Sequence, residues 1–256
     1  MTISNEICEL NLVPVTLFAK DYEDRLKELA NFIKNTPSNS LILASELCIS
    51  GYDFDGLLKS KNDTSALDKL DSKLIKKLKE ALEADKFLGF THLTSFKHED
   101  SAKKQSQKSQ QRTKIYNEFL LLNSAEIFHK QAKHKLFKPN LEDEKFDAGG
   151  EEGIRIFEFY NIKIGVLICF ELRFAEFWVK LQECDIILAP AMWGKAREEA
   201  YMTLCKALAI VNNCFVVASS SLDLEFSGVF LPSGEFKKEV KFDKNLIVKA
   251  RQSIGK

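Results

Sequence analysis

Short apolar runs alternate with amphipathic stretches along most of this 256-residue chain, and this alternation limits the folds that it can form. Residues 40–47 (SLILASEL) are a brief apolar run between turn-forming segments, which is typical of a buried strand. Residues 22–34, just before it, place Leu26, Leu29 and Ile33 on one face of a helix. Strand–helix–strand alternation predicts an α/β fold with a substantial core sheet.

The same two patterns recur toward the C-terminus. Helical spacing predicts further helices over residues 67–85 and 197–212. Apolar runs predict strands over residues 87–93, 115–122, 154–159, 162–168, 185–191, 214–219, 226–231 and 246–248.

One segment stands apart, because residues 97–114 (KHEDSAKKQSQKSQQRTK) contain no apolar residue larger than alanine. So polar a tract cannot bury enough surface to offset the entropy lost on ordering, which predicts a solvated loop or hairpin tip. No flexible linker divides the sequence. We therefore expect a single domain over residues 1–256 with a polar insertion near 97–114.

The charge balance restricts the partners of the chain. It has 37 basic and 37 acidic side chains, which argues against an extended nucleic-acid footprint. No apolar run reaches the roughly 18 residues that span a bilayer, and the N-terminus lacks the basic region of a secretory signal. We expect a cytoplasmic protein that binds neither nucleic acid nor membrane.

The six cysteines are scattered, with no CxxC pair and no histidine at zinc-like offsets, so neither a disulfide framework nor a structural zinc site is predicted. Most are expected to be thiols packed as small hydrophobic groups. Cys169 differs because it directly follows the predicted strand over residues 162–168, which fixes its position and leaves its sulfur accessible. An inert buried thiol remains the alternative.

A nucleophilic cysteine needs a base or a cation, because its thiol is mostly protonated at neutral pH. The four histidines (His92, His98, His129 and His134) lie in or beside polar stretches and are expected to be surface or hairpin residues. Glu46 follows a buried run and is a candidate base, with a structural ion pair as its alternative role. Residues 129–138 (HKQAKHKLFK) contain several lysines, among which spacing alone does not choose.

Together these segments resemble the nitrilase, or carbon–nitrogen hydrolase, superfamily, whose members use a Glu–Lys–Cys triad. The glutamate block is SELCISGYDF, which contains Glu46. The cysteine block is GVLICFELRFAEF, in which Ala175 replaces the usual proline. The family has a lysine three residues before a Leu-Phe pair, which corresponds to Lys133 here, with Lys135 as the alternative.

The resemblance continues downstream, so that its blocks run in the expected order from about residue 40 to residue 235. The segment EDEKFDAG resembles a family motif that makes Glu142 a second active-site carboxylate. DIILAPAMW, ALAIVNNCFVVAS and SGVFLPSGEF resemble the later blocks. Two positions depart from the pattern: Leu208 stands where arginine is usual, and Val211 where glutamate is usual.

The resemblance implies an α/β fold of the α-β-β-α four-layer sandwich type, with mixed sheets and helices on the outer faces. Members commonly pair, so a homodimer or higher homo-oligomer is expected. No metal and no organic cofactor is required.

The resemblance also implies roles for individual residues. Glu46 takes the proton of Cys169, whose sulfur attacks the substrate, and Lys133 stabilises the oxyanion together with the Phe170 backbone N–H. Glu142 helps to position the hydrolytic water.

Loops over residues 52–58, 193–199 and 222–227 are expected to set the substrate preference, with Tyr52 and Trp193 as candidate binding residues. The partners implied are a small-molecule amide and water.

The predicted function is therefore hydrolysis of a non-peptide C–N bond in a small amide, an ω-amide or an N-carbamoyl compound through a cysteine thioester. Two alternatives stay open. One is a catalytically inactive or regulatory member of the superfamily, and the other is a soluble acyltransferase that uses the same thioester.

Overall fold

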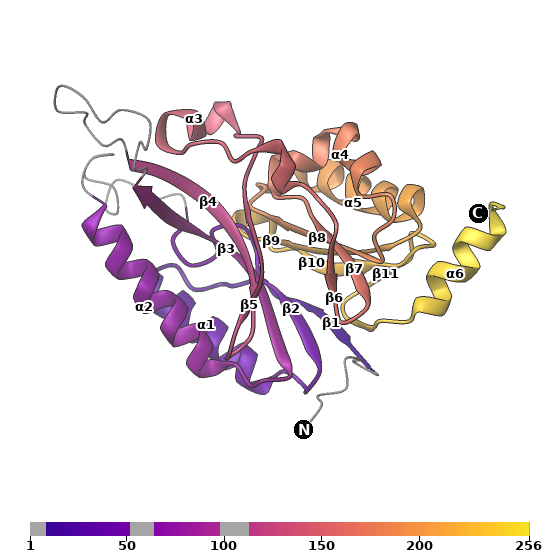
Figure 1. Ribbon diagram of the computed structural model, residues 1–256, viewed down its shortest axis with the longest axis horizontal. Coiled ribbons are helices and arrows are strands. Elements are labelled where there is room, and N and C mark those ends of the chain that lie inside the picture. Colours follow the sequence, from indigo (N-terminus) through magenta and orange to yellow (C-terminus); the bar gives the residue numbers. More distant parts are fainter. Residues whose placement is uncertain (1–8, 52–63, 98–112, 256) are drawn as a thin grey trace, which may run out of the picture.

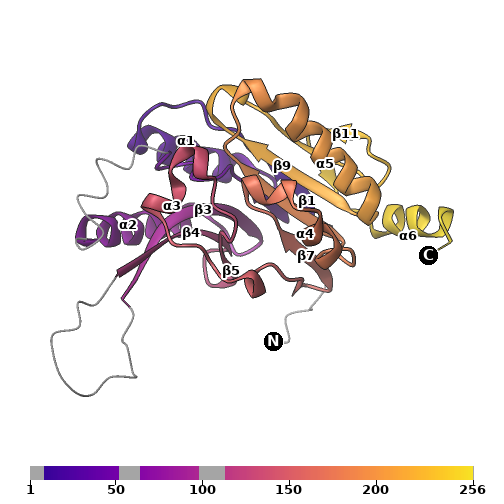
Figure 2. The same cartoon turned by 90° about the horizontal axis from the view of Figure 1, so that it is seen from above.

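The computed structural model of the chain describes residues 9–51, 64–97 and 113–255. Two six-stranded sheets lie face to face, and helices cover their outer faces (Figures 1 and 2). This is the α-β-β-α sandwich that the resemblance implies, so the predicted fold class is confirmed.

The first sheet has the strand order β12-β1-β2-β3-β4-β5. Its strands are β1 (Asn11–Pro14), β2 (Ser40–Leu43), β3 (Lys86–Lys97), β4 (Thr113–Leu122), β5 (Ile127–Ala132) and β12 (Val240–Lys241). The central strands β1, β2 and β3 are parallel, and the remaining pairs are antiparallel.

The second sheet repeats this plan in the order β11-β10-β9-β8-β7-β6. Its strands are β6 (Phe157–Phe159), β7 (Ile162–Val166), β8 (Ile186–Ala191), β9 (Phe215–Ser220), β10 (Ser227–Phe230) and β11 (Phe236–Lys237). Strands β7, β8 and β9 are parallel, and antiparallel strands flank them. Each sheet is therefore built around three parallel strands joined by helical crossovers.

The crossover helices form the outer layers. Helices α1 (Tyr22–Asn35) and α2 (Ser65–Ala81) cover the first sheet, and α4 (Ala175–Lys180) and α5 (Glu198–Asn212) cover the second (Figure 2). The remaining helices are the one-turn α3 (Glu142–Lys145) and the terminal α6 (Lys244–Ser253). The described residues also contain five 3-10 turns: Lys138–Asn140, Glu151–Gly153, Cys169–Arg173, Lys195–Arg197 and Leu222–Leu224.

Alternating side chains of β2 illustrate how the layers pack. Leu41 and Leu43 point to the core between the two sheets, whereas Ile42 packs against the α1 and α2 layer. The face of α1 predicted from its spacing, which includes Leu26 and Leu29, meets this outer side of the sheet. A strand buried on both faces reads as a continuous apolar run, which explains the sequence of residues 40–47.

Most predicted elements match within a few residues, but the strand expected over residues 246–248 is wrong. These residues belong to α6. The Asp243 side chain accepts a hydrogen bond from the Asn245 N–H at 2.9 Å and caps the helix. The cap satisfies a backbone donor at the helix start, so a short apolar run that also suits a strand becomes helical.

The polar insertion joins two strands that pair in register. Strands β3 and β4 are antiparallel out to the pair Lys97 and Thr113. Residues 98–112, most of the predicted insertion, lie outside the described residues. The strands expected on either side of it are confirmed.

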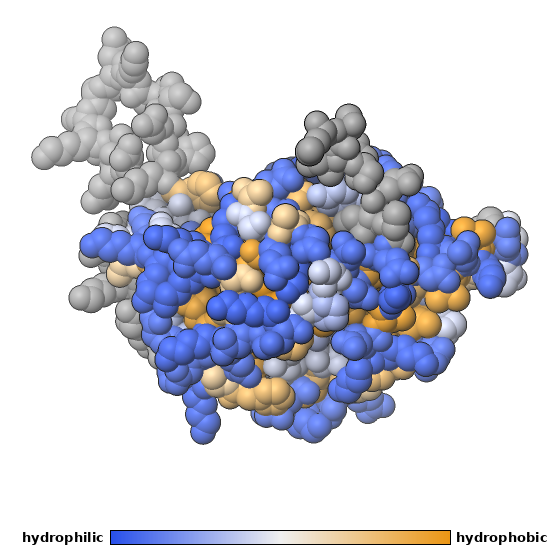
Figure 3. Space-filling view, turned by 90° about the horizontal axis from the view of Figure 1, so that it is seen from below, coloured by the Kyte–Doolittle hydropathy of each residue, from blue (hydrophilic) through white to orange (hydrophobic). Residues whose placement is uncertain are grey.

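On the face seen in Figure 3, hydrophilic residues cover most of the surface, and hydrophobic residues form small separate groups. No helix within the described residues is both long enough and apolar enough to cross a membrane.

Two of the three histidines among the described residues are buried. They lie in the antiparallel strands β3 and β5, which agrees with the expected hairpin position, but the alternative of a surface position is wrong for them. His92 is 4% exposed and pairs with Asp71. His129 is 6% exposed, and its ring stacks on Phe157 with centroids 3.9 Å apart. Both burials come from contacts with distant segments, which local polarity does not reveal.

Burial lowers the pKa of His129 to about 4, so this ring stays neutral in the folded protein across most of the acidic range. An unfolded histidine takes up a proton below about pH 6.5. The unfolded state therefore binds more protons between these values, and the stability that neutral His129 contributes is lost as pH falls from 6.5 toward 4.

The unfolding free energy of the wild type is expected to decrease from pH 7.5 to pH 4.5. In the His129→Leu variant we expect this decrease to be smaller by about 2–3 kcal/mol, because the variant lacks the titrating ring. Urea unfolding at the two pH values measures this difference. Equal losses in both proteins would contradict the assignment of a neutral buried ring.

Candidate active site

The carboxyl ends of four strands face one edge of the sandwich. Strands β2, β7 and β8 belong to the parallel centres of their sheets. Strand β5 points the same way as β3, because two antiparallel pairings separate them. Segments that follow the carboxyl ends of such strands form ligand sites in open α/β sheets.

Glu46 lies in the turn after β2 and is completely buried. Its carboxylate accepts a hydrogen bond from the Asn117 side-chain amide of β4 at 2.9 Å. Its backbone N–H donates to the carbonyl of Ala191 at 3.2 Å, which joins the end of β2 to the end of β8 in the other sheet.

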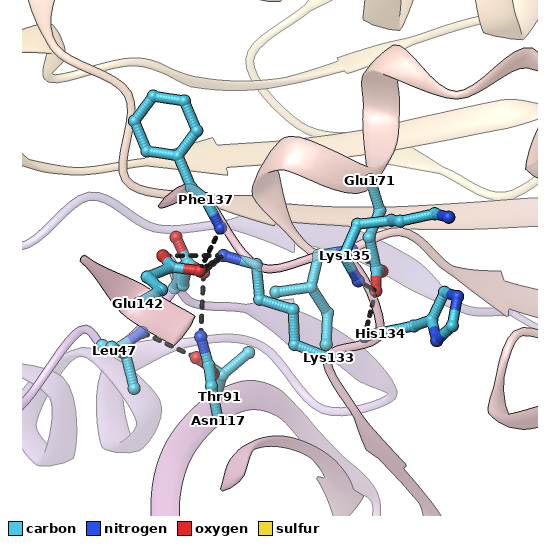
Figure 4. A network of polar contacts seen from close by, with 11 residues as sticks. Leu47, Thr91, Asn117, Lys133, His134, Lys135, Phe137, Glu142 and Glu171 are labelled. Carbon is cyan, nitrogen blue, oxygen red and sulfur yellow. Dashed lines mark hydrogen bonds and ion pairs between the residues drawn. The ribbon is translucent and has the colours of Figure 1, made fainter. Parts of the chain in front are cut away.

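Lys133 directly follows β5, and it too is completely buried. Its Nζ lies 2.7 Å from a carboxylate oxygen of Glu46 and 2.9 Å from both carboxylate oxygens of Glu142. Figure 4 shows Lys133 beside Glu142. Burial alone lowers the pKa of this lysine, but the negative charges of Glu46 and Glu142 and the hydrogen bond to Glu46 outweigh it and raise the pKa above its ordinary value. Lys133 is therefore a permanent cation at neutral pH.

Glu142 is the first residue of α3 and, like Lys133, is completely buried. Besides Lys133, it accepts a hydrogen bond from the Phe137 backbone N–H at 2.7 Å. One ammonium thus lies between two carboxylates. The three groups come from three separate segments of the chain.

Cys169 opens the 3-10 turn after β7, and only 6% of it is exposed. Burial raises the pKa of its thiol well above the ordinary value, and the negative charge of Glu46 and a hydrogen bond with that carboxylate raise it further. Lys133 and a hydrogen bond from the Met192 backbone act in the opposite direction. The proton rests on sulfur, next to a carboxylate that can accept it.

Three residues at the site adopt left-handed backbone conformations without being glycine. Cys169 itself has φ 54°. Leu47, which follows Glu46, has φ 44°, and Leu141, which precedes Glu142, has φ 56°. Such conformations cost roughly 1–2 kcal/mol each and cluster at functional sites. The backbone is therefore strained where it presents the thiol and the two carboxylates.

A cavity of about 330 Å³ opens beside Cys169, large enough for a small organic molecule. Its lining consists of Phe137, Pro139, Asn140, Cys169, Phe170, Arg173, Met192, Trp193 and Arg197. Phe170 and Trp193 thus border the space next to the thiol. Tyr52, the other candidate binding residue, lies outside the described residues.

The lining contains two arginines that no sequence pattern marks as site residues. The guanidinium of Arg173 lies 4.8 Å from the ring centre of Trp193, and that of Arg197 lies 5.0 Å from the ring centre of Phe137. Arg197 belongs to the loop over residues 193–199, one of the loops expected to set the substrate preference. Only the fold shows that the two charges share one cavity.

Lys135, the alternative to Lys133, faces elsewhere. Its Nζ lies 5.1 Å from the ring centre of Phe174 and 5.5 Å from that of Phe177. The structure therefore brings Lys133, and not Lys135, to the two carboxylates. Asn117, which binds Glu46, is a partner that the sequence did not reveal.

The two departures from the family pattern lie on different sides of α5. Leu208 is fully buried in the core, whereas Val211 is 57% exposed. Neither residue lines the cavity beside Cys169.

Across residues 9–51, 64–97 and 113–255, no group of three or more histidine, cysteine, aspartate or glutamate side chains is arranged to hold a metal ion. The cysteines among these residues (Cys48, Cys169, Cys184, Cys205 and Cys214) are all buried free thiols.

Comparison with known proteins gives a consistent result. Residues 12–234 match the model of the carbon–nitrogen hydrolase family. The chain is 30% identical over 112 residues to a deaminated glutathione amidase of Escherichia coli O157:H7, covering 41% of the chain and 42% of that protein. It is 31% identical over 122 residues to a 2-oxoglutaramate amidase of Bacillus subtilis, covering 44% and 46%. These matches span about half the length of the curated relatives.

The fold has solved counterparts. The CN-hydrolase superfamily protein XC1258 of Xanthomonas campestris superimposes with a TM-score of 0.70, covering 96% of this chain and 95% of that one. Its sequence identity to this chain is 18%, so the likeness concerns the fold.

The contacts of Lys133 with Glu46 and Glu142 predict how its replacement changes the stability of the protein. Lys133→Met leaves two buried carboxylates without their cation, so we expect it to lower the unfolding free energy by about 3–5 kcal/mol at pH 8. Lys135→Met, the matched control, costs less than about 1 kcal/mol because it loses only contacts with aromatic rings. Similar losses in the two variants, measured by urea unfolding, would contradict this account.

Proposed function

Because the chain belongs to the carbon–nitrogen hydrolase family, we propose that it is an amidase that cleaves the C–N bond of a small amide through a thioester on Cys169. The observation that carries the proposal is the buried Lys133 ammonium, which contacts Glu46 and Glu142 beside the thiol of Cys169. A nucleophile, a base and a fixed cation are the groups that acyl transfer requires.

In the first step, Glu46 takes the proton of Cys169 as the sulfur attacks the amide carbon. The negative charge that develops on the amide oxygen is stabilised by the Lys133 ammonium and the Phe170 backbone N–H. A well-placed donor of this kind contributes roughly 3–4 kcal/mol to the stability of the transition state.

In the second step, the C–N bond breaks, and Glu46 returns the proton to the departing nitrogen. Ammonia leaves, and the acyl group remains on sulfur as a thioester. Because its raised pKa keeps Lys133 charged, the lysine acts in both steps as a cation and not as a base.

In the last step, water attacks the thioester carbon and gives a proton to Glu46, with Glu142 helping to position the water. The C–S bond breaks, and the thiol of Cys169 is restored by the proton that Glu46 holds. Amide and water have become carboxylic acid and ammonia, and the enzyme is unchanged.

The lining of the cavity favours an ω-amide that carries a carboxylate. Arg173 and Arg197 line the same cavity as Cys169, and among the residues that the structure describes neither forms an ion pair. An arginine fork matches the geometry of a carboxylate. The name of one relative, 2-oxoglutaramate amidase, agrees with this choice, because 2-oxoglutaramate is a monoamide that carries a carboxylate.

The nucleophile is tested by comparing Cys169→Ala with Cys184→Ala, which removes another buried thiol of the same core. Ammonia release is measured with glutaramate, pentanamide and N-carbamoyl-β-alanine. We expect Cys169→Ala to lower the rate at least about 10³-fold, because it removes the atom that forms the intermediate. Cys184→Ala stays within about twofold of the wild type. Activity retained by Cys169→Ala would refute the proposed mechanism.

The substrate preference is tested with Arg197→Met. Glutaramate and pentanamide share the amide and chain length but differ in the terminal carboxylate. A hydrogen bond to a charged group contributes about 1.5–3 kcal/mol, so we expect kcat/KM to fall at least about tenfold for glutaramate and to change little for pentanamide. Lys195→Met, which removes a charge from the same turn but not from the cavity, is the control. Equal losses for both amides would contradict a carboxylate site.

A further inference from the structure

Glu171 is a completely buried carboxylate that the proposed mechanism does not use. One of its oxygens accepts the Ile168 N–H at 2.7 Å. The other accepts the His134 N–H at 2.6 Å and the Lys135 N–H at 3.4 Å (Figure 4). All three hydrogen-bond donors are backbone groups.

These backbone groups lie next to the two central residues of the site. Ile168 directly precedes Cys169, and His134 directly follows Lys133. Cys169 follows β7 of the second sheet, whereas Lys133 follows β5 of the first. A single carboxylate therefore joins the chain segment that carries the thiol to the segment that carries the cation.

The contact with Ile168 also closes the turn of Cys169. The Glu171 N–H donates to the Ile168 carbonyl at 3.1 Å, while the Ile168 N–H donates to the Glu171 side chain. Cys169 lies within this reciprocal pair and has the left-handed φ of 54°. A strained conformation persists only where its surroundings fix it, and Glu171 supplies this restraint.

The surroundings of Glu171 place the change in its protonation state near neutral pH. Among the described residues it has no ion pair within 4 Å, and Lys133 is the cation that acts on it. The neighbouring side chains bind elsewhere: the His134 ring contacts the Gly149 carbonyl, and the Lys135 ammonium lies near the ring of Phe174. Burial raises the pKa of Glu171 to about 7, although the backbone hydrogen bonds and Lys133 act to lower it.

We propose that ionised Glu171 is a positioning residue that holds Cys169 and Lys133 in a fixed relation to each other. The inference rests on the proposed function, in which sulfur and ammonium must reach the same carbonyl group. A protonated carboxyl is a weaker acceptor than a carboxylate, so protonation of Glu171 loosens both segments. It follows that kcat falls as pH is lowered through about 7.

The test is Glu171→Gln, which keeps the shape of the side chain but removes its charge. We expect kcat for glutaramate at pH 8 to fall at least tenfold, with KM changed less than threefold. We expect kcat of the wild type to rise between pH 6 and pH 8 and that of this variant to stay constant over the same range. A variant with the kcat and the pH profile of the wild type would overturn the proposal.

Asp185→Asn is the matched control. Asp185 is also a buried carboxylate, and it accepts a backbone hydrogen bond from Lys163 at 3.0 Å. It lies just before β8, at the opposite end of that strand from the site. We expect this variant to keep kcat within twofold and to retain the pH profile. A loss as large as that of Glu171→Gln would make the effect of Glu171 merely structural and overturn the proposal.

A second measurement needs neither a variant nor a substrate. Hydrogen exchange of the wild type, followed by NMR and corrected for intrinsic rates, reports the protection of the Ile168 and His134 amides. We expect their protection factors to fall at least fivefold from pH 8 to pH 6, while that of the Lys163 amide stays constant. Unchanged protection of Ile168 and His134 would overturn the proposal. Failure of the wild type to hydrolyse any amide would instead refute the proposed function.

Discussion

The buried ammonium of Lys133 is the interaction on which the rest of the site depends. It lies between the carboxylates of Glu46 and Glu142 with contacts of 2.7 and 2.9 Å. Removing three charges from water is costly, and the cost is offset only where the geometry is fixed and each charge has a partner. Because the lysine directly follows β5 while the turn after β2 and the start of α3 carry the carboxylates, the first sheet and both turns must be in place before the cluster forms.

The need to hold the buried groups in a fixed geometry also explains the strained backbone and the protonation state of Cys169. Left-handed conformations at Leu47, Leu141 and Cys169 turn the adjoining side chains toward one point. Packing in the two sheets supports this local cost, as is common at functional sites. Burial beside a carboxylate keeps the proton on Cys169 at rest. In the proposed mechanism the sulfur therefore becomes a thiolate only as it attacks, with Glu46 as the acceptor.

The predictable part of this molecule follows from patterns that are local in sequence. The buried strand over residues 40–47 could be predicted because a strand packed on both faces must be apolar throughout, and the order of the motif blocks indicated Glu46 and Cys169. The choice between Lys133 and Lys135 depends on how the chain leaves β5, which spacing does not encode. Glu171 binds backbone N–H groups, which every residue type except proline has, so its partners leave no sequence signal.

The most direct test of the account is the charge of Lys133, measured by the ¹⁵N chemical shift of its Nζ in lysine-labelled protein, with Lys133→Met assigning the signal. An ordinary lysine is about half deprotonated near pH 10.4. We expect Lys133 to keep the chemical shift of an ammonium from pH 7 to pH 10.5, because two buried carboxylates hold its proton and raise its pKa. A change to the chemical shift of a neutral amine with a midpoint below pH 10 would contradict this expectation. The site would then lack the fixed cation on which the proposed chemistry depends.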